Sequence, residues 1–454
     1  MLVSLDWPDF GRAAAPPPFR VSREEYARRQ ELLRARMRAH GCTHLLVYGD
    51  REHFANLLWT AGLDPRFEEA LLILTPDRDP LLLLGNECVN YAPASPAPLR
   101  IERFQPFSLP DMPRGDSRAL ADILRGEGLG AHSQAAFAGW KDYGQPHQID
   151  APSWLVDAAR FACGFENVRS AAGWFTHPRD GVRTVAHPDE IAYFEWTNTL
   201  ASDGLARVIH ALEPGALDHD LLKHVEYNGV PLACHMTLKC GANRVSLASA
   251  RGERLVRGGR FSAGIGYWGA NVCRCGWVAE SEADLPPEAH GYVPHFVEPY
   301  FEAMAAWFAL LRPGVPGGLL HAAIHDRLPE ETFHIFLNAG HLIGFDEWIC
   351  SPVWAGSDVP LRSGMIVQAD VIPSHPGYYS TRMEDGYLLA DESLRARLSP
   401  GVLDRAAARR AWMRESLGID LDGSVLPLSN LCGWIAPYLL NPGLVMARAK
   451  GVSA

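Results

Sequence analysis

The sequence lacks a long hydrophobic run. Its 454 residues contain no uncharged apolar stretch that approaches the roughly 18 residues needed to span a bilayer. The first residues, MLVSLDWPDFGRAAAPPPF, show no basic region followed by an apolar stretch, so no secretory signal is predicted. We therefore expect a soluble, cytoplasmic protein that does not use a membrane.

Positive charge is also scarce. Lysine and arginine together number 42, against 53 aspartate and glutamate residues, and the formal net charge is -11. Binding to nucleic acid or to an anionic membrane depends on clustered basic side chains that neutralise phosphates. The charge balance therefore argues against both as main partners and leaves small molecules or other proteins.

The nine cysteines do not form a disulfide pattern. They are odd in number and scattered, which is typical of reduced thiols in a cytosolic protein. Only Cys273 and Cys275 lie close together, and their Cys-Arg-Cys spacing differs from the CxxC of zinc ribbons and thioredoxins. The cysteines thus predict neither a disulfide framework nor a zinc site.

Length and patterning predict two domains. A chain of 454 residues exceeds the size at which one hydrophobic core usually stops growing. Ser22 and Glu25 form a capping box that begins a helix reaching Gly41. The expected strands behind this helix are the apolar runs at residues 43–48, 70–75 and 81–84. We assign residues 1–185 to a small α/β domain.

The pattern changes after this first domain. A long amphipathic stretch begins at His187-Pro188-Asp189-Glu190 and stops at Pro214-Gly215. The same order of features returns in a helical stretch at residues 300–311, which stops at Pro313-Gly314. This repetition predicts a duplicated half-domain within residues 186–395. Because Pro-Gly ends many helices, coincidence remains the alternative.

Residues 396–454 are predicted to form a C-terminal helical extension. The helical stretch at residues 403–417 carries four arginines, Arg405, Arg409, Arg410 and Arg414. A charge run of this kind is usually a solvated face of a helix, so we assign it no chemistry.

Three polar side chains of the second half lie in segments that otherwise resemble strands and tight turns. His341 stands between glycines, Asp370 ends a strand that Gly364 opens, and Glu384 follows Arg382 by two positions. Glycine lets the backbone approach a ligand closely, and histidine is a common catalytic and metal-binding group. Taken singly, a lone histidine is more often a satisfied core residue, and an acid at a strand end is more often solvated.

The order and spacing of these three residues resemble a known pattern. Asp370 follows His341 by 29 residues, and Glu384 follows Asp370 by 14. The segments resemble the creatinase, prolidase and aminopeptidase P superfamily, where a glycine-flanked histidine and two downstream carboxylates bind a metal pair. The resemblance implies an α+β protein with a pita-bread catalytic domain, a pseudo-duplicated antiparallel sheet with helices, preceded by the smaller α/β domain.

The chain departs from this pattern at the remaining metal ligands. The family places two aspartates eleven residues apart on a hairpin, and the matching positions hold Ser262 and Cys273. Trp348 stands where the peptidases have a second histidine, and no histidine closely follows Gly241-Ala242-Asn243. A hydroxyl and a thiol are poor substitutes for carboxylates on a divalent cation. We therefore expect no two-metal centre and no cofactor, with a divalent metal on unusual ligands as the alternative.

Creatinase has this architecture without a metal, and it reaches its substrate carboxylate with an arginine from the N-terminal domain of its partner subunit. Arg66 stands at a comparable place in this sequence. The resemblance thus implies a homodimer in which the bidentate guanidinium of Arg66 clamps a substrate carboxylate. The alternative is a surface arginine paired with Glu68 or Glu69.

Our leading hypothesis is a metal-independent or metal-altered hydrolase that cleaves a carbon–nitrogen bond, amide or amidine, in a small carboxylate-bearing substrate. His341, Asp370 and Glu384 are its expected catalytic residues, because two close carboxyl groups can share a proton and act as acid and base. Cys273 is either a nucleophile activated by His341 or an inert buried thiol. The expected substrate-binding residues are Arg66, Trp348 and Arg382.

Three other functions remain open. They are a lyase acting on a small substrate, a non-catalytic binding module similar to the histone-chaperone domains that resemble these peptidases, and an Xaa-Pro metallopeptidase with unusual ligands. The loss of both aspartates and two histidines supports the binding module. The three polar residues retained at the old spacing support an enzyme.

Overall fold

The computed structural model describes residues 1–13, 15–242 and 246–448. The chain forms two compact units, Arg20–Thr184, and Val185–Ala454 together with Met1–Phe19. The first nineteen residues differ from the prediction, which placed them in the N-terminal domain. They belong to the C-terminal unit because strand β1 (Leu2–Ser4) pairs with β16 (Leu444–Met446) in an antiparallel ladder.

The unit Arg20–Thr184 is an α/β domain around one mixed sheet. Its six strands have the order β5-β4-β3-β2-β6-β7. They are β2 (His44–Gly49), β3 (Ala70–Leu74), β4 (Leu81–Leu84), β5 (Arg100–Arg103), β6 (Ala135–Ala138) and β7 (Val168–Ser170). The three expected strands are β2, β3 and β4. Every residue of these strands is buried, as their nearly continuous apolar runs predict.

Helices cover this sheet. They are α1 (Arg23–Ala39), α2 (Ala55–Ala61), α3 (Cys88–Tyr91), α4 (Leu120–Gly126), α5 (Ser153–Cys163) and α6 (Ala172–Thr176), with 3-10 turns at Ala92–Ala94, Gln105–Phe107 and Phe165–Asn167. Helix α1 begins as predicted, because the hydroxyl of Ser22 accepts a hydrogen bond from the amide of Glu25 at 3.1 Å. The core of the unit lies between the sheet and helices such as α4 and α5.

The C-terminal unit contains two antiparallel sheets of four strands each, with the orders β13-β10-β9-β8 and β11-β12-β14-β15. The strands of the first sheet are β8 (Thr237–Lys239), β9 (Arg260–Tyr267), β10 (Ala270–Trp277) and β13 (Arg382–Glu384). Those of the second are β11 (His341–Leu342), β12 (Ile366–Gln368), β14 (Gly386–Leu389) and β15 (Val425–Pro427). Strands β9 and β10 form the predicted hairpin.

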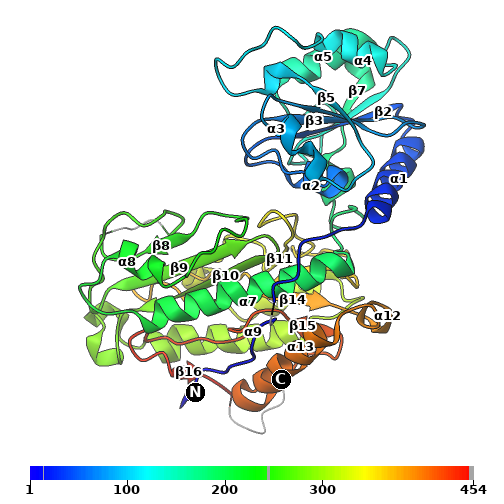
Figure 1. Ribbon diagram of the computed structural model, residues 1–454. Coiled ribbons are helices and arrows are strands. Elements are labelled where there is room, and N and C mark those ends of the chain that lie inside the picture. The colour runs from blue at the N-terminus through cyan, green and yellow to red at the C-terminus, as the bar shows by residue number, and fades with distance from the viewer. Residues whose placement is uncertain (14, 243–245, 449–454) are drawn as a thin grey trace. The chain divides into compact units, whose positions relative to one another are not determined.

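Helices alternate with the strands of both sheets along the chain. They are α7 (Pro188–His210), α8 (Asp218–Lys223), α9 (Glu298–Leu310), α10 (Gly317–His325), α11 (Glu330–Phe333), α12 (Glu392–Arg395) and α13 (Pro400–Trp412). Shorter helical turns lie at Glu282–Asp284, Pro287–Ala289, Val293–Val297 and Met413–Leu417. Helix α7 packs on β9 and β10 (Figure 1). A long helix and a short helix, α7 with α8 and α9 with α10, lead into antiparallel strands twice, as the predicted repeat requires.

Within the described ranges, no helix is both long enough and apolar enough to cross a bilayer.

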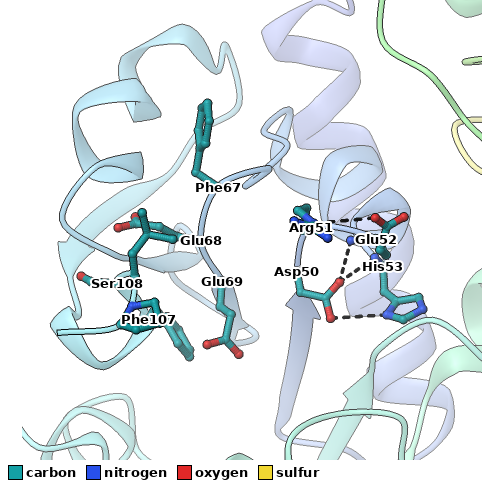
Figure 2. A pocket seen from close by; sticks show the side chains of 11 residues that line it. Asp50, Arg51, Glu52, His53, Phe67, Glu68, Glu69, Phe107 and Ser108 are labelled. Carbon is teal, nitrogen blue, oxygen red and sulfur yellow. Dashed lines mark hydrogen bonds and ion pairs between the residues drawn. The ribbon is translucent and has the colours of Figure 1, made fainter. Parts of the chain in front are cut away.

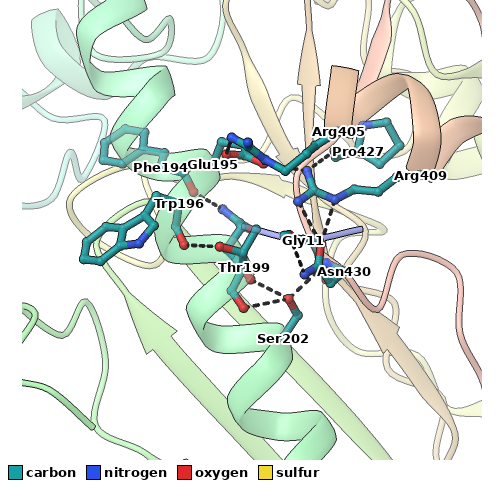
Figure 3. A network of polar contacts seen from close by, with 12 residues as sticks. Gly11, Phe194, Glu195, Trp196, Thr199, Ser202, Arg405, Arg409, Pro427 and Asn430 are labelled. Carbon is teal, nitrogen blue, oxygen red and sulfur yellow. Dashed lines mark hydrogen bonds and ion pairs between the residues drawn. The ribbon is translucent and has the colours of Figure 1, made fainter. Parts of the chain in front are cut away.

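The basic helix α13 corrects one prediction, because two of its arginines do not face solvent. Arg409 is fully buried, and its Nη1 donates to the Glu195 carboxylate on α7 at 2.8 Å. Arg405 donates to the same carboxylate at 2.6 and 2.8 Å (Figure 3). Arg409 also donates to Oδ1 of Asn430 at 2.8 and 2.9 Å. Only Arg414 is as exposed as the solvated-face interpretation predicts.

Candidate active site

The candidate active site lies in the C-terminal unit, where three predicted residues come together from two sheets. His341 stands on β11, Asp370 follows β12 by two residues, and Glu384 ends β13. The Nε2 atom of His341 lies 3.8 Å from Oδ2 of Asp370. Each of the three side chains offers a ligand atom, and these atoms lie within 4.8 Å of one another. The structure thus brings together the three residues that the sequence spacing selected.

His341 is an uncharged imidazole inside this cluster. Its side chain is fully buried, and burial lowers its pKa to about 4. Neither its Nε2 nor Oδ1 of Asp370 has a hydrogen-bond partner among the described residues. Buried polar atoms without partners are costly, and they concentrate at sites that serve function.

The two carboxyl groups form a tightly coupled pair beside a guanidinium. Burial, and then the neighbouring charge of Asp370, raises the pKa of Glu384 well above its usual range. Burial also raises the pKa of Asp370, against the opposing charge of Arg382. Nη1 of Arg382 lies 3.5 Å from Oε2 of Glu384. At neutral pH we expect the pair to hold one proton, with Arg382 stabilising the remaining negative charge.

Two residues that the sequence reasoning missed complete the acidic side of the site. Nδ2 of Asn271 donates to Oε1 of Glu384 at 2.8 Å and to Oε1 of Glu347 at 3.0 Å. Burial raises the pKa of Glu347, and the charge of Asp370 raises it further, against His341. Glu347 follows His341 by six residues in a turn without strand periodicity. The only sequence signal for Glu347 was that it directly precedes Trp348, a predicted substrate-binding residue.

Trp348, a predicted substrate-binding residue, lies directly on the site. Its indole stacks on the imidazole of His341, with ring centroids 4.0 Å apart and ring planes inclined by 13°. Trp348, which stands where the peptidases have a second histidine, therefore covers His341. A half-buried aromatic ring here is suited to contacting a substrate at His341.

The hairpin carries Ser262 and Cys273 on one face of the first sheet. Cys273 pairs directly with Glu384, and Ser262 pairs with Cys275. Burial, followed by the Glu384 charge, raises the pKa of the Cys273 thiol well above its ordinary value. A protonated thiol is a weak nucleophile. This environment favours the inert-thiol interpretation of Cys273 over the nucleophile.

The donor set does not fit the metal pair that the resemblance implies. One imidazole and two carboxylates are suitable donors for a single divalent ion. The hairpin, however, supplies a hydroxyl and a thiol where a second ion needs carboxylates. Arg382 also brings a positive charge to within 3.5 Å of Glu384. The residues 243–245, where the sequence lacks a further histidine, lie outside the described residues.

Arg66, the proposed clamp, belongs to the other unit. Its Nε lies 2.6 Å from Oδ2 of Asp64, and its guanidinium lies 4.6 Å from the centre of the Phe54 ring. Arg66 thus forms an ion pair with Asp64, an acid that the surface-arginine alternative, which named Glu68 or Glu69, did not include. The role of Arg66 across a dimer stays a prediction.

The unit Arg20–Thr184 also holds a cavity of about 340 Å³ (Figure 2). Its lining residues are Asp50, Arg51, Glu52, His53, Phe67, Glu68, Glu69, Phe107, Ser108, Leu109 and Pro110. Asp50 accepts hydrogen bonds from the amides of Glu52 and His53 at 2.9 and 2.7 Å. The carboxylate of Glu68 accepts one from the amide of Cys88 at 2.9 Å. These two acids therefore serve the local backbone.

Comparison with solved structures identifies the fold. The prolidase from Pyrococcus horikoshii has a TM-score of 0.62 and 15% sequence identity, and the match covers 80% of this chain and 95% of that protein. Dipeptidase PepE from Mycobacterium ulcerans has a TM-score of 0.61 and 17% identity, covering 90% and 97%. The chain therefore has the pita-bread fold of prolidases, with a small α/β domain before it, as predicted.

The same fold occurs outside peptidases. The N-terminal domain of the FACT complex subunit SPT16 from Cicer arietinum (chickpea) has a TM-score of 0.56 and 14% identity, and the match covers 82% of this chain and 95% of that domain. No protein-family model and no curated protein matches the sequence. At these identities the likeness establishes the fold alone.

Proposed function

We propose that the protein is a hydrolase that cleaves a carbon–nitrogen bond, amide or amidine, in a small carboxylate-bearing substrate without a metal pair. The observation that supports this most is the convergence of His341, Asp370 and Glu384, whose ligand atoms lie within 4.8 Å of one another. Burying each of these three polar groups costs free energy. That cost favours a functional role for the cluster.

The reaction adds water across the carbon–nitrogen bond. The oxygen of water bonds to the carbonyl or amidine carbon, and the nitrogen departs as an amine. One carboxylate of the Asp370 and Glu384 pair accepts a proton from the attacking water, and the protonated partner donates one to the departing nitrogen. The neutral imidazole of His341 hydrogen-bonds the substrate or the water, and Trp348 excludes bulk solvent from its ring.

A binding module is the second candidate. Its support is the burial of the whole cluster, since His341, Asp370 and Glu384 are each less than 5% exposed. Because the chain also matches a domain of the FACT complex subunit SPT16, its fold does not by itself imply catalysis.

The experiment that separates enzyme from binder is Glu384→Gln with Glu392→Gln as its matched control. Glu392 is an exposed residue of α12 and lies outside the site. Small amides, guanidino acids and Xaa-Pro dipeptides form the substrate panel. We expect Glu384→Gln to lower turnover by about 100-fold or more, and Glu392→Gln to leave it unchanged. If wild type is inert on the whole panel, the binding module becomes the better description.

Metal analysis of the purified protein tests whether it is a metal-altered hydrolase or an Xaa-Pro metallopeptidase with unusual ligands. A single divalent ion, if bound, would be held by His341, Asp370 and Glu384 and would supply Lewis-acid polarisation of the substrate. We expect less than stoichiometric metal and activity that survives chelation. A tightly bound stoichiometric transition metal would instead favour the metallopeptidase with unusual ligands.

Product analysis separates hydrolysis from a lyase reaction, because only hydrolysis incorporates oxygen from labelled water.

A further inference from the structure

Four side chains stand at one level across the first sheet of the C-terminal unit. Lys239 pairs with Ser262, Ser262 with Cys275, and Cys275 with Arg382. Paired residues of antiparallel strands place their side chains on the same face of the sheet. Lys239, Ser262, Cys275 and Arg382 therefore form one row, which we name the basic row, with a cation at each end and two small side chains between them.

The row next to it contains Glu384. Thr237 pairs with Gly264, Gly264 with Cys273, and Cys273 with Glu384. Successive rows on the same face are two residues apart along each strand, so the basic row lies beside the carboxyl pair. The basic row therefore adjoins the carboxyl pair at Arg382, whose Nη1 lies 3.5 Å from Oε2 of Glu384, and Lys239 stands at the opposite end of the row.

Tyr379 lies against the basic row. Nζ of Lys239 is 4.5 Å from the centre of its ring, and the guanidinium carbon of Arg260 is 5.4 Å away. Burial raises the pKa of Tyr379, and a side-chain hydrogen bond with Ser262 opposes this rise to a smaller extent. This interaction places the phenol beside the hydroxyl of the row.

The backbone of Tyr379 is held in a costly conformation to reach this position. Its φ is 72°, in the left-handed region that bulky residues avoid. Two hydrogen bonds of 2.8 Å between the backbones of His375 and Tyr379 close the turn. The Nδ1 atom of His375 accepts further bonds from the amides of Gly377 and Tyr378, at 3.1 and 3.0 Å. Strain maintained in this way is typical of a functional site.

We propose that the basic row is the subsite for the substrate's carboxylate, bound between Lys239 and Arg382 within one subunit, with the hydroxyls of Ser262 and Tyr379 as further donors. This inference rests on the proposed function for the adjoining carboxyl pair, and it adds where the acidic group of the substrate lies. Lys239 is half-buried, and the side chain of Arg382 keeps 13% of its surface exposed. The Nε of Arg382 has no hydrogen-bond partner among the described residues.

Charge distribution supports a carboxylate here. Three cationic side chains, Lys239, Arg260 and Arg382, share this face of the sheet, and the β-ladder positions across it supply one acid, Glu384. An anion bound at the basic row is separated from Glu384 by the spacing of one row. A small substrate can therefore present its carboxylate to Lys239 and its scissile nitrogen to the carboxyl pair.

The test compares the binding of N-acetylglycine with that of N-acetylglycinamide by titration calorimetry. The two compounds share an amide and differ in their acidic group, and calorimetry reports binding whether or not cleavage follows. We expect wild type to bind the acid about tenfold more tightly than the amide, and Lys239→Met to remove that preference. Lys239→Arg should restore it. Lys223→Met, which changes an exposed lysine on α8, is the matched control.

Several outcomes would overturn the proposal. They are equal binding of the two compounds by wild type, no binding of the acid, and an unchanged preference in both Lys239→Met and Lys239→Gln. Loss of the preference in Arg66→Met alone would assign the carboxylate to the other unit. A protein that binds the acid through Lys239 but turns over nothing would refute the hydrolase and leave this subsite standing.

Discussion

The indole of Trp348 lies nearly parallel to the imidazole of His341, and their ring centroids are 4.0 Å apart. The contact buries one face of a histidine whose side chain has no solvent exposure. A stacked aromatic ring supplies both dispersion energy and shielding from water. Trp348 therefore limits the access of solvent and substrate to His341.

Replacing Trp348 by alanine should expose His341. We expect the variant to lose about 2 kcal/mol of unfolding free energy, and His341 to become reactive toward diethylpyrocarbonate, as followed by peptide mass spectrometry. Trp140→Ala is the matched control, because Trp140 stacks on His53 with ring centroids 4.8 Å apart. That control should leave His341 protected, whereas His53, whose side chain is already 39% exposed, should react with or without Trp140. Equal protection of His341 in both variants would contradict the shielding role.

Stability of the unit Arg20–Thr184 should depend on the protonation of Asp64. Burial raises the pKa of Asp64 to about 6, although its ion pair with Arg66 opposes the shift. The folded state therefore binds this proton more tightly than the unfolded chain, whose ordinary aspartate pKa is about 3.9. The resulting stabilisation is present below the unfolded value and is lost as the pH rises through about 6.

We expect Asp64→Asn to flatten this part of the stability profile. Between pH 4 and pH 7, wild type should lose up to about 3 kcal/mol relative to the variant, since each pKa unit corresponds to about 1.4 kcal/mol. Urea denaturation of both proteins across this range measures the difference. Asp77→Asn, at an exposed turn, is the control. Parallel profiles for wild type and Asp64→Asn would contradict the raised pKa.

The ion pairs of α13 and of the helical turn Met413–Leu417 that follows it should contribute unequally to stability. Arg409→Met leaves the fully buried carboxylate of Glu195 with one partner fewer and removes both bonds to Asn430, so we expect a loss of about 3 kcal/mol or more. Arg405 is more exposed, and Arg405→Met should cost less. Arg414→Met should change stability by less than about 0.5 kcal/mol. Equal losses for the three variants, measured by denaturant unfolding, would refute this ranking.

These arginines also show where sequence information ends. The cap of Ser22 could be predicted because its partner, Glu25, is three residues away, and the hydrogen bond forms as expected. The acceptor of Arg409 is Glu195, which is 214 positions away in the chain. A helical pattern identifies a charge run, but it does not identify which distant element will bury part of it. The solvated-face interpretation failed for that reason.

The candidate site could likewise be predicted from the sequence only in part. His341, Asp370 and Glu384 were found because their spacing resembles a known pattern, and the structure brings them together. Glu347 was missed because it lies in a turn that has no periodicity. The basic row was missed because Lys239 joins it only through the register of β8 against β9, and neither strand's own pattern determines that register.

Restoring carboxylates on the hairpin should create a metal site. Cys273 stands directly across the ladder from Glu384, and Ser262 lies on the same face one row away. The double variant Ser262→Asp, Cys273→Asp would add two oxygen donors to His341, Asp370 and Glu384. Manganese binding to the folded state alone then raises its melting temperature.

We expect the metal-free double variant to melt below wild type, because two further carboxylates repel the existing pair. Excess Mn²⁺ should raise its melting temperature by several degrees more than that of wild type. Ser262→Asn, Cys273→Asn has similar volume without the added charge and should show neither effect. An equal response of wild type and the aspartate variant to Mn²⁺ would mean that the hairpin positions do not limit metal binding. The departure from the metal-pair pattern would then have to lie elsewhere, with Trp348 as the first residue to test.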